Sequence, residues 1–192
     1  MAVLPNVLAR HLDVVFCGTA VGKRSAELGA YYAGPGNKFW PTLHQIRLTP
    51  RRLLPAEYRK LLRWRLGLTD LAKHVSGADS TLRRKDFSAA ALRKLIAKYQ
   101  PRYVAFTSKR AGREYFGSVV DYGLHRSQMG TTRFFVLSSP SGLASRYWQK
   151  GRHWYELAAL VRELPPNNRI ERRVRNKVPS SSVGARGAHA ER

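Results

Sequence analysis

The sequence has one cysteine, few acidic residues and no long hydrophobic run. Cys17 alone excludes an internal disulfide, and its place in an apolar run predicts a buried thiol in a reducing compartment. No stretch reaches the roughly 18 apolar residues that a membrane span needs. Polar residues interrupt the first apolar run, which is not the pattern of a signal peptide. We therefore expect a cytoplasmic protein, in a bacterial-type cytosol or associated with the nucleoid.

Negative charge is scarce relative to positive charge. The 192 residues include 35 Lys and Arg but 12 Asp and Glu, which gives a formal net charge of +23. Such a surplus predicts a polyanionic partner, most often nucleic acid. The alternative is a solvated basic surface or a basic tail. Removing residues 165–192 leaves the rest of the chain strongly basic, so the tail does not explain the charge by itself.

Patterns for metal and nucleotide binding are also missing. The histidines are dispersed without metal-ligand spacing, and one cysteine cannot supply the four ligands of an iron–sulfur cluster. Residues 18–24 invite comparison with a phosphate-binding Walker loop. Their glycine spacing is one residue short, and Arg24 stands where Ser or Thr must reach magnesium. We therefore predict no metal and no cofactor.

Short apolar runs alternate with segments of helical spacing along the chain. The runs that read as buried strands are residues 12–17, 103–107 and 134–138. The segments with helical spacing are residues 25–32, 39–46, 56–66, 87–99, 109–116 and 147–164, while residues 18–24 and 67–71 read as turns.

This alternation indicates a parallel sheet with helices on both faces. We predict an α/β fold over residues 1–164, a single-domain three-layer sandwich whose central sheet is twisted and mostly parallel. After residue 164 the composition changes to Asn, Arg, Ser, Gly and Ala with few large apolar residues. Residues 165–192 are therefore predicted to be a basic, disordered tail.

Three segments near the ends of predicted strands contain residues that could bind a ligand. Glycines flank residues 18–22 and leave backbone amides free to meet a ligand, and an aromatic run with a Gly-Pro-Gly turn follows at residues 31–40. Residues 139–145 combine serines with Leu143 at a strand-to-helix junction. The serines and amides there could hold a phosphate. Leu143 could be a wedge between bases or a helix-start staple.

These segments resemble, in order, the motifs of the uracil-DNA glycosylase superfamily, closest to its mismatch-specific uracil and thymine-DNA glycosylase branch. FCGTAVG at residues 16–22 resembles the first motif, and YAGPGNKFW at residues 32–40 resembles the loop that forms the base pocket. GLTD at residues 67–70 resembles the pocket turn that follows, and SPSGLAS at residues 139–145 resembles the second DNA-binding motif. Four ordered matches are far more specific than any one of them.

The resemblance implies an enzyme that flips a damaged base out of duplex DNA and cleaves its glycosidic bond without a metal. We predict that Gly18, Thr19, Ala20, Tyr32, Asn37 and Asp70 bind the base; the resemblance implies that Tyr32 stacks on it. We predict that Lys23, Ser139, Ser141, Gly142, Leu143, Ala144 and Arg146 bind DNA; the resemblance implies that Leu143, with Gly142 and Ala144, forms the wedge.

Three positions depart from the family pattern. At the position of Ala20, the first motif normally has an Asn or Asp that positions the attacking water; Val21 replaces a Pro and Ser139 replaces an Asn. We predict that the catalytic polar group has moved. Asp70 is the first candidate, for water activation or cation stabilisation. Asn37 is the second, as a neutral group that holds water or base, although it could equally be an amide that fixes the loop.

The sequence therefore predicts a monofunctional, monomeric DNA glycosylase that removes uracil from double-stranded DNA in base-excision repair. A branch of the superfamily that lacks the first-motif Asn removes hypoxanthine and has a similar Tyr-Tyr-Ala loop, so hypoxanthine is an alternative substrate. A non-catalytic module that binds damaged DNA is the alternative from another class. Release of base from defined duplexes separates the three.

Overall fold

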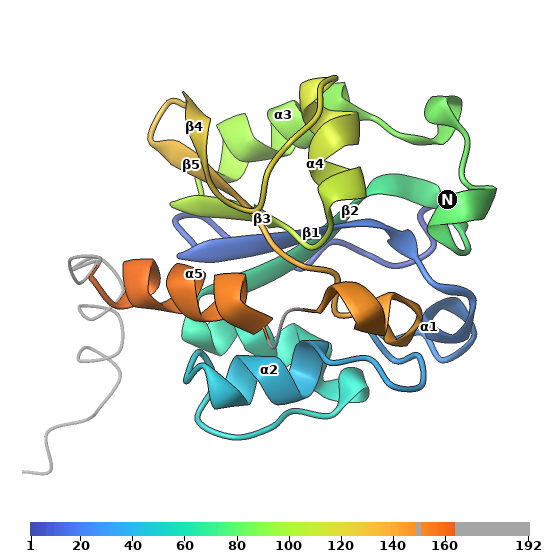
Figure 1. Ribbon diagram of the computed structural model, residues 1–192, viewed down its shortest axis with the longest axis horizontal. Coiled ribbons are helices and arrows are strands. Elements are labelled where there is room, and N and C mark those ends of the chain that lie inside the picture. Colours follow the sequence, from blue (N-terminus) through green and yellow to red (C-terminus); the bar gives the residue numbers. More distant parts are fainter. Residues whose placement is uncertain (149–150, 164–192) are drawn as a thin grey trace, which may run out of the picture. The chain divides into compact units, whose positions relative to one another are not determined.

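The computed structural model describes residues 1–148 and 151–163, which form a five-stranded sheet with helices on both faces (Figure 1). The strands are β1 (Val14–Val21), β2 (Leu66–Ser76), β3 (Tyr103–Phe106), β4 (Gly123–Met129) and β5 (Thr132–Val136). Their order is β2-β1-β3-β5-β4, and all neighbours are parallel except β4, which pairs antiparallel with β5. The predicted α/β fold with a mostly parallel sheet is confirmed.

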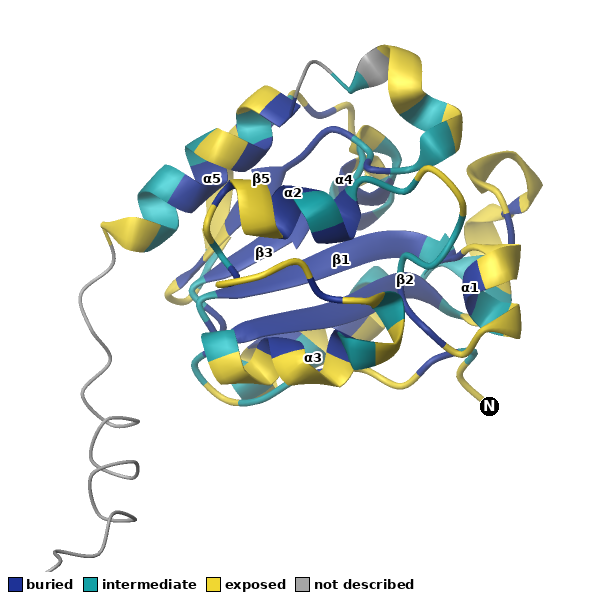
Figure 2. Cartoon of the chain, turned by 90° about the horizontal axis from the view of Figure 1, so that it is seen from below, coloured by how far each residue is buried: buried dark blue, intermediate teal, exposed yellow. Residues whose placement is uncertain are grey.

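The helices complete two outer layers. The α-helices are α1 (Lys23–Glu27), α2 (Phe39–Gln45), α3 (Ala89–Tyr99), α4 (Lys109–Phe116) and α5 (Arg152–Arg162), and the 3-10 helices are η1 (Pro55–Trp64), η2 (Asp79–Thr81), η3 (Arg84–Asp86) and η4 (Gly142–Tyr147). Figure 1 shows α3 and α4 over one face of the sheet and α2 and α5 over the other. Figure 2 shows the buried strands between α3 and the layer of α2 and α5. Among the described residues, no helix is long and apolar enough to cross a bilayer.

Strand β1 lies inside the sheet, between β2 and β3, and both of its faces are covered by apolar residues. Val15 and Cys17 pack with residues of α3 and α4 in one core cluster. Phe16 points to the other face, where its ring stacks on Trp154 of α5 at 5.7 Å and meets Phe39 of α2 edge-on at 5.2 Å. Side chains alternate along a strand, so Gly18 and Ala20 lie on the same face as Phe16. This alternation sends the pocket residues of β1 toward α2.

Two segments predicted as turns are strands. Residues 18–21 continue β1, and residues 67–71 lie inside β2. Gly67 serves close packing, because a Cβ there would lie 2.6 Å from the carbonyl oxygen of Val7. Asp70 is 5% exposed in the middle of β2. The prediction was wrong here because Gly67 and Asp70 are residue types common in turns. In the structure, Gly67 allows close packing against Val7 and Asp70 lines the pocket.

Other elements differ from the prediction in extent. The edge strand β4 was not predicted, and the helix predicted at residues 56–66 is the 3-10 helix η1. In place of one helix over residues 147–164, η4 ends at Tyr147 and α5 begins at Arg152. The predicted tail at residues 165–192 and its boundary at residue 164 lie outside the described residues, so they stay predictions.

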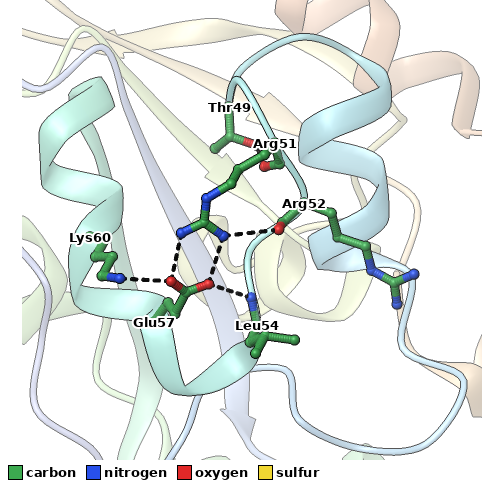
Figure 3. A network of polar contacts seen from close by, with 6 residues as sticks. All are labelled: Thr49, Arg51, Arg52, Leu54, Glu57 and Lys60. Atoms are coloured by element: carbon green, nitrogen blue, oxygen red, sulfur yellow. Dashed lines mark hydrogen bonds and ion pairs between the residues drawn. The ribbon is translucent and has the colours of Figure 1, made fainter.

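A charged network fixes the segment between α2 and η1 (Figure 3). The guanidinium of Arg51 donates to both carboxylate oxygens of Glu57, at 2.6 and 2.9 Å, and Lys60 and the Leu54 amide donate to the same carboxylate at 2.7 and 3.0 Å. The hydrogen bonds from Arg51 and then Lys60 hold the pKa of Glu57 well below its usual range. The network orders the start of η1, from which Tyr58 meets the ring of Tyr31 at 5.5 Å.

Replacing Trp154 with phenylalanine should lower the free energy of unfolding by about 1–3 kcal/mol, because it leaves a buried carbonyl without its donor. The indole Nε1 of Trp154, which is fully buried, donates to the carbonyl oxygen of Ser138 at 3.0 Å, just before the loop at residues 139–145. Urea denaturation measures the change. Tyr155→Phe, on the exposed side of α5, is the matched control; equal losses in both variants would reject the role of the indole hydrogen bond.

Candidate active site

A pocket of about 600 Å³ opens at the carboxyl ends of β1 and β3. The chain leaves β1 for β2 on one side and later returns to β3 on the other side. The loops that follow β1 and β3 therefore diverge at this point. In parallel α/β sheets, such a switch point is where ligands bind. The pocket is also lined by the loop after α1 and by residues 139–144 after β5.

Asp70 reaches the pocket from β2 because Gly18 has no side chain. The two residues are paired in the parallel register of β1 and β2. A Cβ on Gly18 would lie 2.5 Å from Oδ1 of Asp70, so the carboxylate occupies the space above the Gly18 backbone. Ala20 lies on the same face two residues further along β1, and its methyl group carries no polar atom. The structure thus brings a carboxylate from the neighbouring strand to the part of the pocket where the first motif has none.

The backbone of Thr19 lies where β1 extends beyond the end of β3. The carbonyl oxygen of Cys17 accepts the Thr107 amide at 2.9 Å, and the pairing of β1 with β3 ends there. Backbone groups two residues apart point the same way along a strand, so the amide and carbonyl of Thr19 point to the β3 side, past its end. The side chain of Thr19 donates to Asp79 at 2.6 Å. Thr19 therefore offers a ligand its backbone, while its hydroxyl holds the loop that carries η2.

Tyr32 forms an aromatic wall of the pocket. Its ring stacks on Phe39 with centroids 3.9 Å apart and planes 12° from parallel. Its hydroxyl lies 3.3 Å from the Thr107 hydroxyl. The backbone of Tyr32 has φ 54°, in the left-handed region that only a few non-glycine residues adopt. A conformation of this kind is retained where surrounding structure imposes it, and here it sets the ring against Phe39.

Asn37 has a structural task as well as a place in the pocket. Its side-chain oxygen accepts the amide of Phe39 at 3.0 Å, at the start of α2. The oxygen therefore serves the backbone, as expected for an amide that fixes the loop. The NH₂ group of Asn37 is the part that a ligand in the pocket can meet.

Residues 139–145, the Leu143 loop, present one large apolar side chain to solvent. Leu143 is 88% exposed although it lines the pocket rim. The hydroxyl of Ser139 accepts the amide of Ser141 at 3.3 Å, and that of Ser141 accepts the amide of Leu143 at 3.3 Å. The serine hydroxyls therefore fix the backbone of the loop. The exposed Leu143 gains no hydrophobic stabilisation in the protein without DNA.

The Leu143 loop is fastened to residues 31–38, the tyrosine loop. The Lys38 amide donates to the carbonyl oxygen of Pro140 at 2.8 Å, and its ammonium donates to the Ser145 hydroxyl at 2.7 Å. A Cβ on Gly142 would lie 2.7 Å from the carbonyl oxygen of Pro35, so only glycine allows this contact without displacement. The pocket wall that carries Tyr32 and the rim that carries Leu143 are therefore packed together.

Burial shapes the protonation of the groups around Asp70. It raises the pKa of Asp70, and the positive charge of Lys73 opposes that rise. Burial likewise raises the pKa values of the Tyr31 and Tyr32 hydroxyls and of the Cys17 thiol well above their usual ranges. These three groups are neutral at physiological pH. Asp70 is the acidic member of the group, with a pKa higher than that of an exposed aspartate.

Most of the predicted site residues meet in this one pocket. Those that line it are Gly18, Thr19, Ala20, Lys23, Tyr32, Asn37, Asp70, Ser139, Ser141, Gly142, Leu143 and Ala144. Arg146 lies on η4 with an exposed side chain and is not among the lining residues. Thr107 and Asp79 also line the pocket. They were not predicted, because their contacts with Tyr32 and Thr19 join segments distant in sequence.

Comparison with known proteins agrees with the fold. The model of the uracil DNA glycosylase superfamily matches residues 5–162. The chain belongs to this superfamily. Among solved structures, it is similar to the solution NMR structure of a candidate uracil DNA glycosylase from Methanosarcina acetivorans, with a TM-score of 0.56 and 22% sequence identity. The likeness covers 83% of this chain and 94% of the archaeal one and shows a shared fold.

Membership of the superfamily assigns the chemistry at a general level. The chain is a DNA glycosylase, a hydrolase of the bond between base and sugar, and its partner is DNA. The strongly basic composition agrees with that partner.

Proposed function

We propose that this glycosylase removes uracil from double-stranded DNA and releases the base by hydrolysis alone. The observation that carries the proposal is the buried carboxylate of Asp70 above Gly18, inside a pocket that also contains Tyr32. The flipped base would lie against the free face of the Tyr32 ring. Extrusion costs a few kcal/mol and is least costly at a mispaired or damaged base, which favours uracil opposite guanine over an intact pair.

Asp70 has the charge and the position to replace the absent polar side chain at Ala20. As the bond between C1′ and the base nitrogen breaks, its electron pair leaves with the base and positive charge develops on the sugar. An ionised Asp70 stabilises that cation and accepts a proton from the water that adds to C1′. Cleavage then requires the carboxylate form, so its rate should fall as pH drops through the raised pKa of Asp70.

The leaving base also needs hydrogen-bond donors, since it departs with negative charge. The Thr19 amide and the Asn37 NH₂ group are two donors at the pocket wall, and the Thr19 carbonyl can accept from a ring N–H. Preorganised donors of this kind stabilise developing charge without reorganisation. Uracil presents both carbonyl oxygens and an N–H on one edge, which suits this set.

Hypoxanthine is the second candidate substrate, because a pocket of about 600 Å³ admits a bicyclic base. Single-turnover release should be measured on matched duplexes that carry uracil, hypoxanthine or thymine opposite guanine. Faster release of uracil supports the proposal. Preference for hypoxanthine would reassign the substrate, and tight binding without release from any duplex would identify a damage-binding module.

Leu143→Ala should slow release of uracil from duplex DNA by about tenfold or more, because the unstacking that the leucine offsets is worth a few kcal/mol. Uracil in single strands needs no wedge, so the variant should process it at nearly the wild-type rate. Leu54→Ala, a change at another exposed leucine (65%) outside the pocket, is the control. Equal slowing on both substrates would reject the wedge.

A further inference from the structure

We propose that Lys73 is a positioning residue for this reaction, which acts by keeping Asp70 ionised and directed over Gly18. The inference rests on the proposed function, since it concerns the same site. Lys73 is not among the residues that line the pocket. Lys73 contacts Asp70 on the side away from the pocket, so it acts on the reaction only through Asp70.

An irregularity in β2 puts Lys73 on the side of Asp70. The register pairs Ala20 with Ala72 and then Val21 with Ser76, so residues 73–75 have no partner on β1. Regular alternation would direct Lys73 to the opposite face of the sheet from Asp70, because the two are three residues apart. Extra residues in a strand re-aim side chains and are frequent beside active sites. Here the extra residues return the Lys73 side chain to the pocket face.

Three contacts hold the ammonium group there. Its Nζ donates to the Tyr31 hydroxyl at 2.9 Å and lies 5.5 Å from the centre of the same ring. Nζ is 3.6 Å from Oδ2 of Asp70, an ion pair in which the side chains are only 13% and 3% exposed. The amide of Val3 donates to the Lys73 carbonyl oxygen at 2.8 Å and secures the irregular backbone. A buried lysine held in this way is a fixed charge rather than a mobile surface group.

The two oxygens of Asp70 have different surroundings. Oδ2 is buried and has no hydrogen bond of ordinary length from the described residues; the charge of Lys73 is the largest influence that favours its ionised form, and the Tyr31 hydroxyl adds to it. Oδ1 lies above Gly18, on the pocket side. A carboxylate buried without a compensating charge would take up a proton. Lys73 therefore keeps the charge on Asp70 while leaving Oδ1 for the reaction.

Besides Lys73, three ionisable groups among the described residues interact electrostatically with Asp70, and none of them titrates near neutral pH. The charge of Asp70 acts on the hydroxyls of Tyr31 and Tyr32 in the tyrosine loop and on the thiol of Cys17, which lies on the other face of β1. All three are neutral, because burial raises their pKa values. Burial lowers the pKa of Lys73, and the charge of Asp70 raises it, so each member of the pair stabilises the ionised form of the other.

The test is the pH dependence of single-turnover uracil release in Lys73→Met. Loss of an opposite charge at this distance should move the acid limb of the profile up by about 1–3 pH units. Lys73→Arg retains the charge, so its acid limb should stay close to that of the wild type. Lys98→Met removes the same formal charge from the exposed side of α3 and controls for weaker DNA binding. Lys73→Gln, a shorter polar replacement, serves if methionine prevents folding.

A slower reaction with an unmoved acid limb in Lys73→Met and Lys73→Gln would overturn the inference and leave Lys73 a structural residue. If the wild type releases no base, the proposed function fails, and the carboxyl group of Asp70 is then titrated directly by carbon-13 NMR. Its signal is assigned by its loss in Asp70→Asn. An upward shift of its pKa in Lys73→Met supports the pairing without any activity, and an unchanged pKa rejects it.

Discussion

Asp70→Asn is expected to lower single-turnover release of uracil by about 10²–10⁴-fold, the usual contribution of a positioned acid–base group. Asparagine has nearly the same size, so the space above Gly18 stays filled. It cannot carry the negative charge that opposes the cation on the sugar, and it cannot accept the proton of the attacking water. The acid limb of the pH profile should disappear with the carboxylate.

Two measurements distinguish lost chemistry from lost binding. Affinity for duplex DNA should change little, because Asp70 is buried and the substitution alters no Lys or Arg. Asn37→Ala, at the other candidate residue, should lower the rate of base release less than Asp70→Asn does. The side-chain oxygen of Asn37 accepts the amide of Phe39 at the start of α2 and is not free for catalysis. If Asp70→Asn releases base at the wild-type rate, Asp70 has no catalytic role.

Gly18→Ala is also expected to lower the rate of single-turnover uracil release, although the substitution removes no polar group. The added Cβ would lie 2.5 Å from Oδ1 of Asp70, closer than real contacts allow, and both residues belong to paired strands that cannot separate freely. The carboxylate must therefore rotate away. A displacement of about 1 Å at a reacting group can cost on the order of 10²-fold in rate. Overpacking should also lower the free energy of unfolding by about 1–3 kcal/mol.

Gly22→Ala is the matched control for this change. A Cβ on Gly22 meets no atom within 4 Å, and its φ of −66° suits alanine. Thermal unfolding and base release should both be measured for the two variants. Comparable rates in the two variants would show that Asp70 does not need the space that Gly18 leaves.

The centre of the fold was predictable because burial on both faces leaves a plain signal. The runs around Val15 and Val104 are continuously apolar, as central parallel strands are. The edge strand β4 was missed because most of its side chains are exposed or half-buried, and its sequence GLHRSQM has no apolar alternation. β2 was mistaken for a turn at residues 67–71, since Gly67 and Asp70 are typical turn residues. Local preference fails there because the site and close packing decide the residue types.

The candidate site was predictable as a set of segments but not as a network. The order of the motifs predicted that Tyr32, Asp70 and Leu143 line one pocket. They do so because the carboxyl ends of parallel strands, and the loops that follow them, meet at the same edge of the sheet. Lys73 could not be found in this way, because its direction depends on three unpaired residues in β2 that no sequence pattern revealed. The hydrogen bond from Thr19 to Asp79 likewise joins residues 60 positions apart.

The fastening of the Leu143 loop to the tyrosine loop has a consequence for how the protein scans DNA. Lys38 bonds to both ends of the Leu143 loop, and Gly142 lies against the tyrosine loop. With Leu143 as the proposed wedge, we expect its insertion into the DNA double helix to bring the Tyr32 ring to the extruded nucleotide. Each insertion would then also test one base, and rejection would withdraw both loops together. We therefore expect the time spent at each undamaged pair to be set by one unit rather than by two successive motions.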